Sequence, residues 1–184
     1  MIKSINDSNF NGKRVLVRVD FNVPIKDGQI KDLTRIESAL PTVDKIIDDG
    51  GIPILISHLG RPNGYQIEFS LKPIANYLKD YYGYNVLFVD DCIGEKVENI
   101  VKSAATGDVV LLENLRFHPE EEQNDDEFAK KLANLADIYV NDAFGSIHRA
   151  HSSIAAVCKY FPEKYVGYLL LTELKFLGDA LDNP

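Results

Sequence analysis

The amino-acid sequence predicts an α/β fold in three layers: a parallel sheet of about six strands with helices on both faces. Three observations favour it. Short apolar runs recur along the chain, and amphipathic stretches of helical length lie between them. The length of 184 residues allows one domain with a full core, and not two large ones. Together they indicate a single doubly wound, Rossmann-like domain.

The expected strands are the apolar runs themselves. Runs of four to eight apolar residues bounded by polar residues are typical of strands that are buried on both faces of a parallel sheet. Five such runs cover residues 14–19, 52–57, 85–89, 108–112 and 137–141.

Three amphipathic stretches between these runs predict helices, over residues 34–51, 70–83 and 125–136. In the first, apolar residues recur at helical spacing from Ile36 to Ile47, and a pair of glycines ends the stretch. The second begins at a serine, which is a favourable N-cap, and also ends in glycine. The third repeats the apolar spacing.

The last segment, residues 167–184, carries four leucines from Leu170 to Leu181 on one stripe, so we expect a long helix there. The sequence then ends in Asp-Asn-Pro, a helix-breaking signal. We therefore place a domain over residues 1–170 and a helix that leads to an interdomain linker over residues 171–184.

The composition narrows the classes of function. A formal net charge of −8 argues against a general nucleic-acid binder, whose surface would be basic. No apolar run approaches the roughly 18 residues that span a bilayer, and the first residues lack the apolar stretch of a signal peptide. The cysteines, Cys92 and Cys158, have no metal-ligand spacing and make no disulfide framework. We expect a cytoplasmic protein with reduced thiols and with neither a nucleic-acid nor a membrane partner.

Cations gather in one segment of this acidic chain. The sequence YVNDAFGSIHRAHSS, residues 139–153, places His148, Arg149 and His151 after an apolar run. Ligands of open α/β sheets bind outside the carboxyl ends of the strands, and the loops that follow parallel strands emerge at one edge. The segment therefore predicts an anion site at that edge.

The loops after the other expected strands supply partners for such a site. Arg35 is separate, at the start of the first expected helix. We expect four arginines and up to four histidines to line one cleft that suits a small phosphorylated or carboxylated molecule, because arginine offers such anions a planar fork. The polar and cationic candidates in these loops are Asp20, Asn22, His58, Arg61, Glu113, Asn114, Arg116 and His118.

Simpler interpretations apply to each residue taken alone. A loop arginine usually faces solvent or pairs with a carboxylate, and loop aspartates such as Asp20 and Asp142 more often cap turns than act in catalysis. The acidic run Glu120–Glu122 is expected in a solvated loop or a first helical turn. His148 and His151 have no third ligand at a recognisable spacing, so we expect no metal site. Neither a G-x-G-x-x-G nor a Walker-type loop is present, so we expect no nucleotide site.

Four long segments resemble the phosphoglycerate kinase family. They are RVLVRVDFNVP, ISHLGRP, LLENLRFHPEEEQND and YVNDAFGSIHRAHSS, in the family's order, and the similarity covers essentially the whole chain. The resemblance implies the N-terminal, phosphoglycerate-binding domain of a monomeric, two-domain glycolytic kinase. That enzyme transfers a phosphoryl group from 1,3-bisphosphoglycerate to ADP, giving 3-phosphoglycerate and ATP.

The resemblance also implies partners and a cofactor. The partners are 3-phosphoglycerate, 1,3-bisphosphoglycerate and the C-terminal domain of the same enzyme. The cofactor is magnesium-bound ADP or ATP, which the family holds in that C-terminal domain. This chain lacks the family's glycine- and lysine-containing nucleotide loops, so we expect it to bind no cofactor and to be inactive alone.

The family's site residues can be carried onto matching positions of this sequence. Arg35 is expected to be the catalytic residue, and Asp20 and Asn22 suit the glycerate. Three arginines suit the phosphate that is not transferred. The substrate-binding set that the resemblance implies is Asp20, Phe21, Asn22, Arg35, His58, Leu59, Gly60, Arg61, Arg116 and Arg149, with His151, Arg18 and His148 in a surrounding basic patch.

Two other classes of function stay open. One is a free-standing α/β module that binds small anions and never partners a second domain, against which the linker-like end of the sequence counts. The other is half of a nucleotide-binding oxidoreductase, which the missing glycine fingerprint disfavours.

Overall fold

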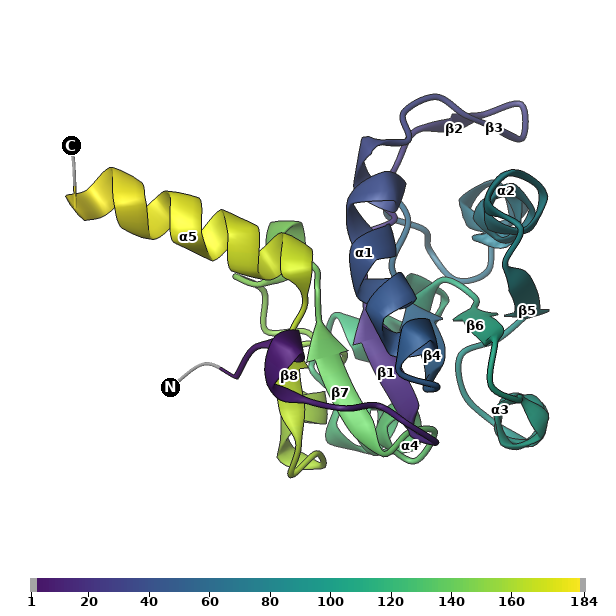
Figure 1. The fold of residues 1–184 in the computed structure, drawn as a ribbon. Helices are drawn as coiled ribbons and strands as arrows, with labels where there is room; N and C mark the ends of the chain where they lie inside the picture. Colours follow the sequence, from purple (N-terminus) through teal and green to yellow (C-terminus); the bar gives the residue numbers. More distant parts are fainter. Residues whose placement is uncertain (1–2, 183–184) are drawn as a thin grey trace.

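A parallel sheet of six strands forms the centre of the computed structural model, which describes residues 3–182 (Figure 1). The strands lie in the order β5-β6-β4-β1-β7-β8, and every neighbouring pair is parallel. The predicted fold is confirmed, and the five predicted apolar runs form five of the strands. The bounds are β1 Arg14–Arg18, β4 Ile52–Ile56, β5 Asn85–Val89, β6 Asp108–Leu112, β7 Ile138–Asn141 and β8 Lys164–Val166.

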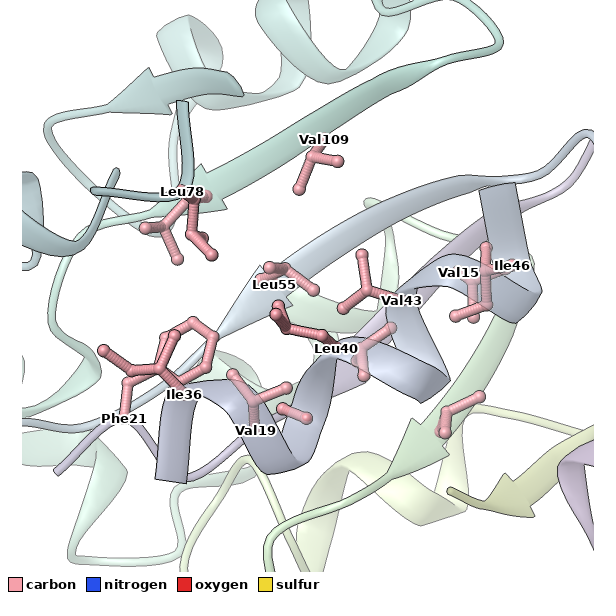
Figure 2. Close-up of a cluster of buried hydrophobic side chains, with 14 of the residues drawn as sticks. Val15, Val19, Phe21, Ile36, Leu40, Val43, Ile46, Leu55, Leu78 and Val109 are labelled. Carbon is pink, nitrogen blue, oxygen red and sulfur yellow. The ribbon is translucent and has the colours of Figure 1, made fainter. Parts of the chain in front are cut away.

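Helices cover both faces of the sheet because alternate residues of each strand point to opposite sides. Val15 and Val17 of β1 belong to the core cluster that α1 and α2 cover, part of which is shown in Figure 2. Leu16, between them, belongs to a second cluster that α3 and α4 cover. These helices are α1 Thr34–Asp48, α2 Lys72–Tyr82, α3 Glu95–Ser103 and α4 Asp126–Ala133.

The predicted helices form where their apolar spacing and end signals place them. In α1 the buried residues from Ile36 to Ile46 face the sheet. Helix α2 ends at Gly83, whose φ of 73° is a left-handed cap that glycine adopts without strain. The side chain of Asp125 caps α4 by accepting the N–H of Phe128 at 2.7 Å. Helix α3 was not predicted, because its fully buried face is only Val97 and Val101.

The last predicted helix is present as α5, Tyr168–Asp182, and it projects away from the sheet (Figure 1). Leu170 is fully buried at its base, whereas Phe176 and Leu177 farther along are exposed. The predicted leucine stripe is therefore buried only at its first position among the side chains that can be described. Leu181 and the Asn183-Pro184 end lie outside that set.

Smaller elements complete the fold. A hairpin of β2 and β3 precedes α1, and β8 adds the edge strand that no apolar run had identified. The remaining bounds are β2 Ile25–Lys26 and β3 Gln29–Ile30, with short 3-10 helices η1 Ile5–Asp7, η2 Ile67–Phe69, η3 Leu115–Phe117, η4 Pro119–Glu121, η5 Phe144–Ser146 and η6 Ala156–Lys159.

No helix within residues 3–182 combines the length and the apolarity needed to cross a bilayer.

Candidate functional site

The inner strands β6, β4, β1 and β7 are neighbours, so the loops after them meet at one edge of the sheet. Hydrogen bonds join these loops to one another. The amide of Asn114 donates to the carbonyls of Leu59 at 2.8 Å and Phe69 at 2.9 Å, and its oxygen accepts the N–H of Arg116 at 3.0 Å. Asn22 accepts the N–H of Gly60 at 2.8 Å. The loops after β1, β4 and β6 are thereby held in one arrangement.

Gly60 shows how tight that arrangement is. Its φ of +62° lies in the left-handed region, which L side chains rarely adopt. A Cβ atom at this position would also lie 2.3 Å from the ring of Phe69. Only glycine fits here, so the turn can bring its backbone close to the neighbouring loops.

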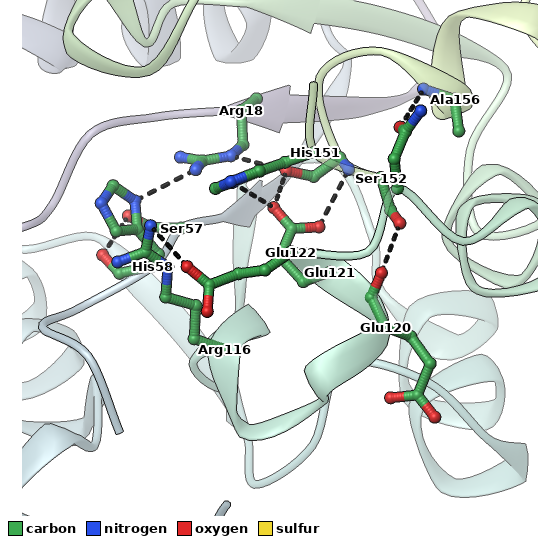
Figure 3. A network of polar contacts seen from close by, with 12 residues as sticks. Arg18, Ser57, His58, Arg116, Glu120, Glu121, Glu122, His151, Ser152 and Ala156 are labelled. Carbon is green, nitrogen blue, oxygen red and sulfur yellow. Dashed lines mark hydrogen bonds and ion pairs between the residues drawn. The ribbon is translucent and has the colours of Figure 1, made fainter. Parts of the chain in front are cut away.

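A basic centre surrounds the end of β1. Arg18 is the last residue of that strand and is fully buried, which is unusual for an arginine. Its Nη2 donates to Nδ1 of His58 at 3.0 Å, and its Nε donates to Oγ of Ser153 at 2.8 Å (Figure 3). Arg116, Arg149 and His151 lie close enough for their charges to act on His58.

His58 is held in its neutral form. Burial lowers its pKa to about 2, and the positive fields of the surrounding groups, first Arg18 and then Arg116, add to the effect. Since a guanidinium can only donate, Nδ1 accepts the bond from Arg18 and the proton of the imidazole stays on Nε2. His58 therefore offers an N–H donor rather than a charge.

A buried carboxylate balances part of this positive charge. Glu121 is fully buried and accepts two hydrogen bonds from Ser153, one from its N–H at 2.9 Å and one from its Oγ at 2.6 Å (Figure 3). Nδ1 of His151 lies 4.0 Å from the same carboxylate. His58, Arg18, Ser153 and Glu121 thus form one continuous buried polar network.

Arg116 is the second buried arginine of the centre. Its Nη1 donates to the carbonyl of Gly60 at 2.6 Å, and its Nη2 lies 3.2 Å from the exposed carboxylate of Glu122. Its Nε is buried and has no hydrogen-bond partner within the described part of the chain. Burial lowers the pKa of this guanidinium. The buried Nε is thus a donor that the described contacts leave open.

Arg35 and Asp20 form a second group at the same edge. Nη1 of Arg35 lies 2.7 Å from Oδ2 of Asp20, and the arginine side chain is 50% exposed while that of Asp20 is 7% exposed. A Cβ atom on Gly145 would lie 2.6 Å from the same oxygen, so the loop after β7 needs glycine there. The pair borders a hollow of about 230 Å³ that also reaches Glu173 on α5. Arg35 is therefore oriented by Asp20 yet open to solvent on its other side.

Most of the predicted site residues lie at this edge, but two of them are exposed and one lies elsewhere. Arg61 and His148 are exposed. His118 turns toward the end of β5, where its Nε2 lies 2.7 Å from Oδ1 of Asp91, so of the up to four histidines expected in one cleft, His118 is not a member. Phe21 and Leu59 are buried and support the loops.

Two candidate carboxylates have structural roles. Glu113 is buried and accepts the hydroxyl of Ser70 at 2.6 Å and the N–H of Leu71 at 2.8 Å. Asp142 is buried and accepts the N–H of Leu170 at 3.1 Å, so it caps α5 as a loop aspartate commonly does. Burial raises the pKa of Asp142 to about 6.

The sequence did not identify Glu121 and Ser153 as site residues. The acidic run was expected in a solvated loop or a first helical turn; Glu121 does lie in the first turn of the short helix η4, but its carboxylate is fully buried rather than solvated. The sequence signal was weak, because nothing in the neighbouring residues tells which of three consecutive glutamates is buried.

One group of three potential metal ligands is found in the part of the chain that the structure describes. It consists of Asp91, Cys92 and His118, and it lies away from His148 and His151.

Sequence comparisons with known proteins all point to one family. The sequence matches the family described as Phosphoglycerate kinase over residues 5–184. The phosphoglycerate kinase of Chloroherpeton thalassium is 54% identical over 183 residues, which are 99% of this chain and 46% of that protein. That of Dictyoglomus turgidum is 53% identical over 183 residues, which are 100% of this chain and 46% of that protein. The chain thus spans about half the length of the curated relatives it matches.

Two solved structures of phosphoglycerate kinases share the fold of this chain. The structure of phosphoglycerate kinase from Coxiella burnetii has a TM-score of 0.89 at 38% identity, covering 100% of this chain and 46% of that one. The crystal structure of phosphoglycerate kinase from Pyrococcus horikoshii has a TM-score of 0.86 at 31% identity, covering 95% of this chain and 44% of that one. Both similarities extend over nearly all of this chain.

Proposed function

The chain belongs to the phosphoglycerate kinase family, and we propose that it is the N-terminal, phosphoglycerate-binding half of a two-domain enzyme of this kind. In the whole enzyme a phosphoryl group passes from 1,3-bisphosphoglycerate to ADP, giving 3-phosphoglycerate and ATP. The chain spans about half the length of its relatives, so we place the magnesium-nucleotide site in the other half. This half alone would bind phosphoglycerate and would not turn over, since nothing would hold ADP in line with the acyl phosphate.

The observation that carries the proposal is the convergence of cations around a neutral histidine. Arg18, Arg116, Arg149 and His151 all act on His58 at the edge of the sheet where ligands of such folds bind. Glu121 balances only part of this charge, so the cationic and potentially cationic groups repel one another unless a further anion joins them. A phosphorylated acid supplies that charge.

Within this site we assign the substrate groups by chemistry. The phosphate that is not transferred would lie against Arg116, Arg149 and the exposed Arg61, whose planar forks suit phosphate oxygens. The hydroxyl and carboxyl groups of the glycerate would lie by Asp20 and Asn22, which pack against each other through the 3.2 Å bond from the N–H of Asn22 to Oδ1 of Asp20. His58 would donate its Nε2 proton.

We assign Arg35 to the phosphoryl group in transfer. Its side chain is half exposed and its direction is set by Asp20 at 2.7 Å, so it can reach a group that arrives from the open side of the edge. Phosphoryl transfer requires positioning and charge stabilisation more than covalent chemistry by the protein. No side chain has to act as a general base, because the attacking oxygen of the acceptor is already ionised.

Calorimetric titration of the chain with 3-phosphoglycerate tests the proposal. We expect one site, affinity that falls as salt is added, and binding on the order of tenfold tighter than that of inorganic phosphate, which is about 1.4 kcal/mol. Arg149→Gln should weaken binding by at least about tenfold, whereas Arg14→Gln should not. Arg14 is the matched control because it pairs with Asp137 at the opposite end of β1.

Other outcomes would favour the alternatives. Equal affinity for inorganic phosphate and 3-phosphoglycerate would support a free-standing module for small anions. Saturable binding of magnesium-ADP, or ATP formation by this chain alone, would contradict the placement of the nucleotide in the other half.

A further inference from the structure

A mixed group of possible metal ligands lies beside the site, at the ends of β5 and β6. Asp91 and Cys92 follow β5, and His118 lies in the turn after β6. One carboxylate oxygen of Asp91, Sγ of Cys92 and a ring nitrogen of His118 all lie within 4.8 Å of one another. Because Cys92 and His118 are far apart in the sequence, no spacing indicated this group.

We propose that Asp91, Cys92 and His118 bind a Zn²⁺ ion. Thiolate, imidazole and carboxylate are the three ligand types that zinc uses in proteins, and no hard cation such as Mg²⁺ favours the sulfur. A zinc ion bound at about 2.0–2.3 Å to each ligand needs the ligand atoms about 3.3–3.8 Å apart. Oδ1 of Asp91 and Nε2 of His118 are now 2.7 Å apart, so the pair has to open by well under 1 Å.

In chemical terms the metal would take the place of a proton. The 2.7 Å contact between Asp91 and His118 shares one hydrogen, and Zn²⁺ would occupy that position with both atoms as ligands. The thiol of Cys92 would lose its proton to solvent on binding, because a metal-bound thiol is deprotonated. For each ion bound, the thiol proton of Cys92 would therefore pass to solvent, and the hydrogen between Asp91 and His118 would pass to Nδ1 of the ring or to solvent.

The electrostatic surroundings favour a cation at this position. The carboxylates of Asp90 and Glu113 line the same hollow as Asp91 and His118, and their negative charges attract a divalent cation there. The nearby cation Lys96 is engaged by Asp90.

The group is reachable from solvent. Asp91 and His118 line a hollow of about 200 Å³ whose wall also includes Tyr65 and Phe117. The side chain of Asp91 is 47% exposed and that of His118 is 26% exposed, while Cys92 forms the buried side of the group. The hollow gives an ion access to Asp91 and His118 and leaves room for a water molecule as the fourth ligand, while Sγ of Cys92 would approach from the buried side.

The surrounding contacts already orient two of the ligands. Oδ1 of Asp91 accepts the N–H of Cys92 at 2.6 Å, and the ring of His118 packs against Phe128 with 5.4 Å between centroids. A bound ion would link the loop after β5 to the turn after β6 that carries Arg116 and Glu121. We therefore expect zinc to raise the melting temperature of the chain.

Titration of the chain with Zn²⁺ and with Co²⁺, after removal of metals by a chelator, tests the inference. We expect one ion per chain, release of protons on binding, and a sulfur-to-cobalt charge-transfer band in the near ultraviolet with tetrahedral d–d bands. Cys92→Ser should abolish the charge-transfer band, and His118→Gln should weaken zinc binding by at least about tenfold. Cys158→Ser is the matched control, since Cys158 is the other free thiol and lies outside the group.

Three results would overturn the inference: no saturable binding, binding without a charge-transfer band, or equal zinc affinity in Cys92→Ser. If Cys92→Ser fails to fold, the cobalt spectrum of the unmodified chain and the affinity of His118→Gln decide the question. None of these readouts depends on phosphoglycerate, so the inference stands or falls separately from the proposed function.

Discussion

Arg18 and His58 are joined by a buried hydrogen bond of 3.0 Å, in which the guanidinium of Arg18 donates to Nδ1 of the imidazole. The two residues come from the ends of adjacent strands, β1 and β4, and Arg18 pairs in register with Ile56. The bond places an arginine charge and an oriented N–H donor at the centre of the site. It also makes the ionisation of His58 the first quantity to test.

His58 should stay neutral in the folded chain from pH 4 upward. Its pKa is about 2 in the folded state and near 6.5 when unfolded. Between these two pH values the unfolded state therefore binds one proton that the folded state does not. The contribution to stability is complete above about pH 6.5 and falls as the pH drops, by at most about 1.4 kcal/mol per unit. The measurement is the free energy of unfolding by urea at several pH values for the unmodified chain and His58→Asn. The variant should show a shallower loss below pH 6.5, whereas His148→Asn, at an exposed histidine, should follow the unmodified chain. Identical slopes in all three would refute this assignment.

Glu121→Gln should destabilise the chain and weaken 3-phosphoglycerate binding although Glu121 touches no solvent. It removes the buried negative charge that reaches Arg18 through Ser153, and uncompensated buried charge typically costs about 3–5 kcal/mol. Glu127→Gln is the matched control: that carboxylate is exposed on α4, and exposed charges contribute about 1 kcal/mol or less. Urea unfolding and calorimetry measure the two effects. Similar values for both variants would mean that Glu121 is not the counter-charge.

Asp142→Asn should change how stability depends on pH. The folded pKa of Asp142 is raised to about 6, above the unfolded 3.8, so the folded state binds the extra proton between these values. The ionised carboxylate therefore costs stability above pH 6, up to about 3 kcal/mol, and this cost disappears as the pH falls toward 3.8. Asparagine keeps an oxygen for the N–H of Leu170 and carries no charge. The stability of the variant relative to the unmodified chain should be greatest near pH 7 and should decline by pH 4. A constant difference across that range would contradict the shift.

In the two-domain enzyme proposed above, Arg35→Ala and Arg61→Ala should separate catalysis from binding. Arg35 is assigned to the group in transfer, so its loss should lower kcat by about 10²–10³ with little change in the KM for phosphoglycerate. Arg61 is assigned to the phosphate that does not react, so its loss should mainly raise KM. Steady-state kinetics at saturating nucleotide measure both constants. Equal effects of the two variants on kcat and KM would rule out this division of roles.

The sequence alone determined the layers of this protein and the edge where its site lies. The apolar runs that became β1, β4, β6 and β7 identify buried strands because each is short and apolar on both faces, whereas β5, at the edge of the sheet, is only partly buried. Parallel strands bring their following loops to one edge, so the sequence alone predicts that Asp20, His58, Arg116 and Arg149 lie near one another. Four motifs in order also identified the family.

Only the tertiary structure decided which of these side chains meet and in what ionisation state. His58 is neutral because the packed loops bury it among arginines, and Glu121 differs from its acidic neighbours because the loop after β7 closes over it. His118 meets Asp91 and Cys92 because β5 and β6 are neighbours, an order that no local pattern encodes. Burial and pairing depend on contacts between residues far apart in the chain, whereas strands and helices are specified by spacings of two to four residues.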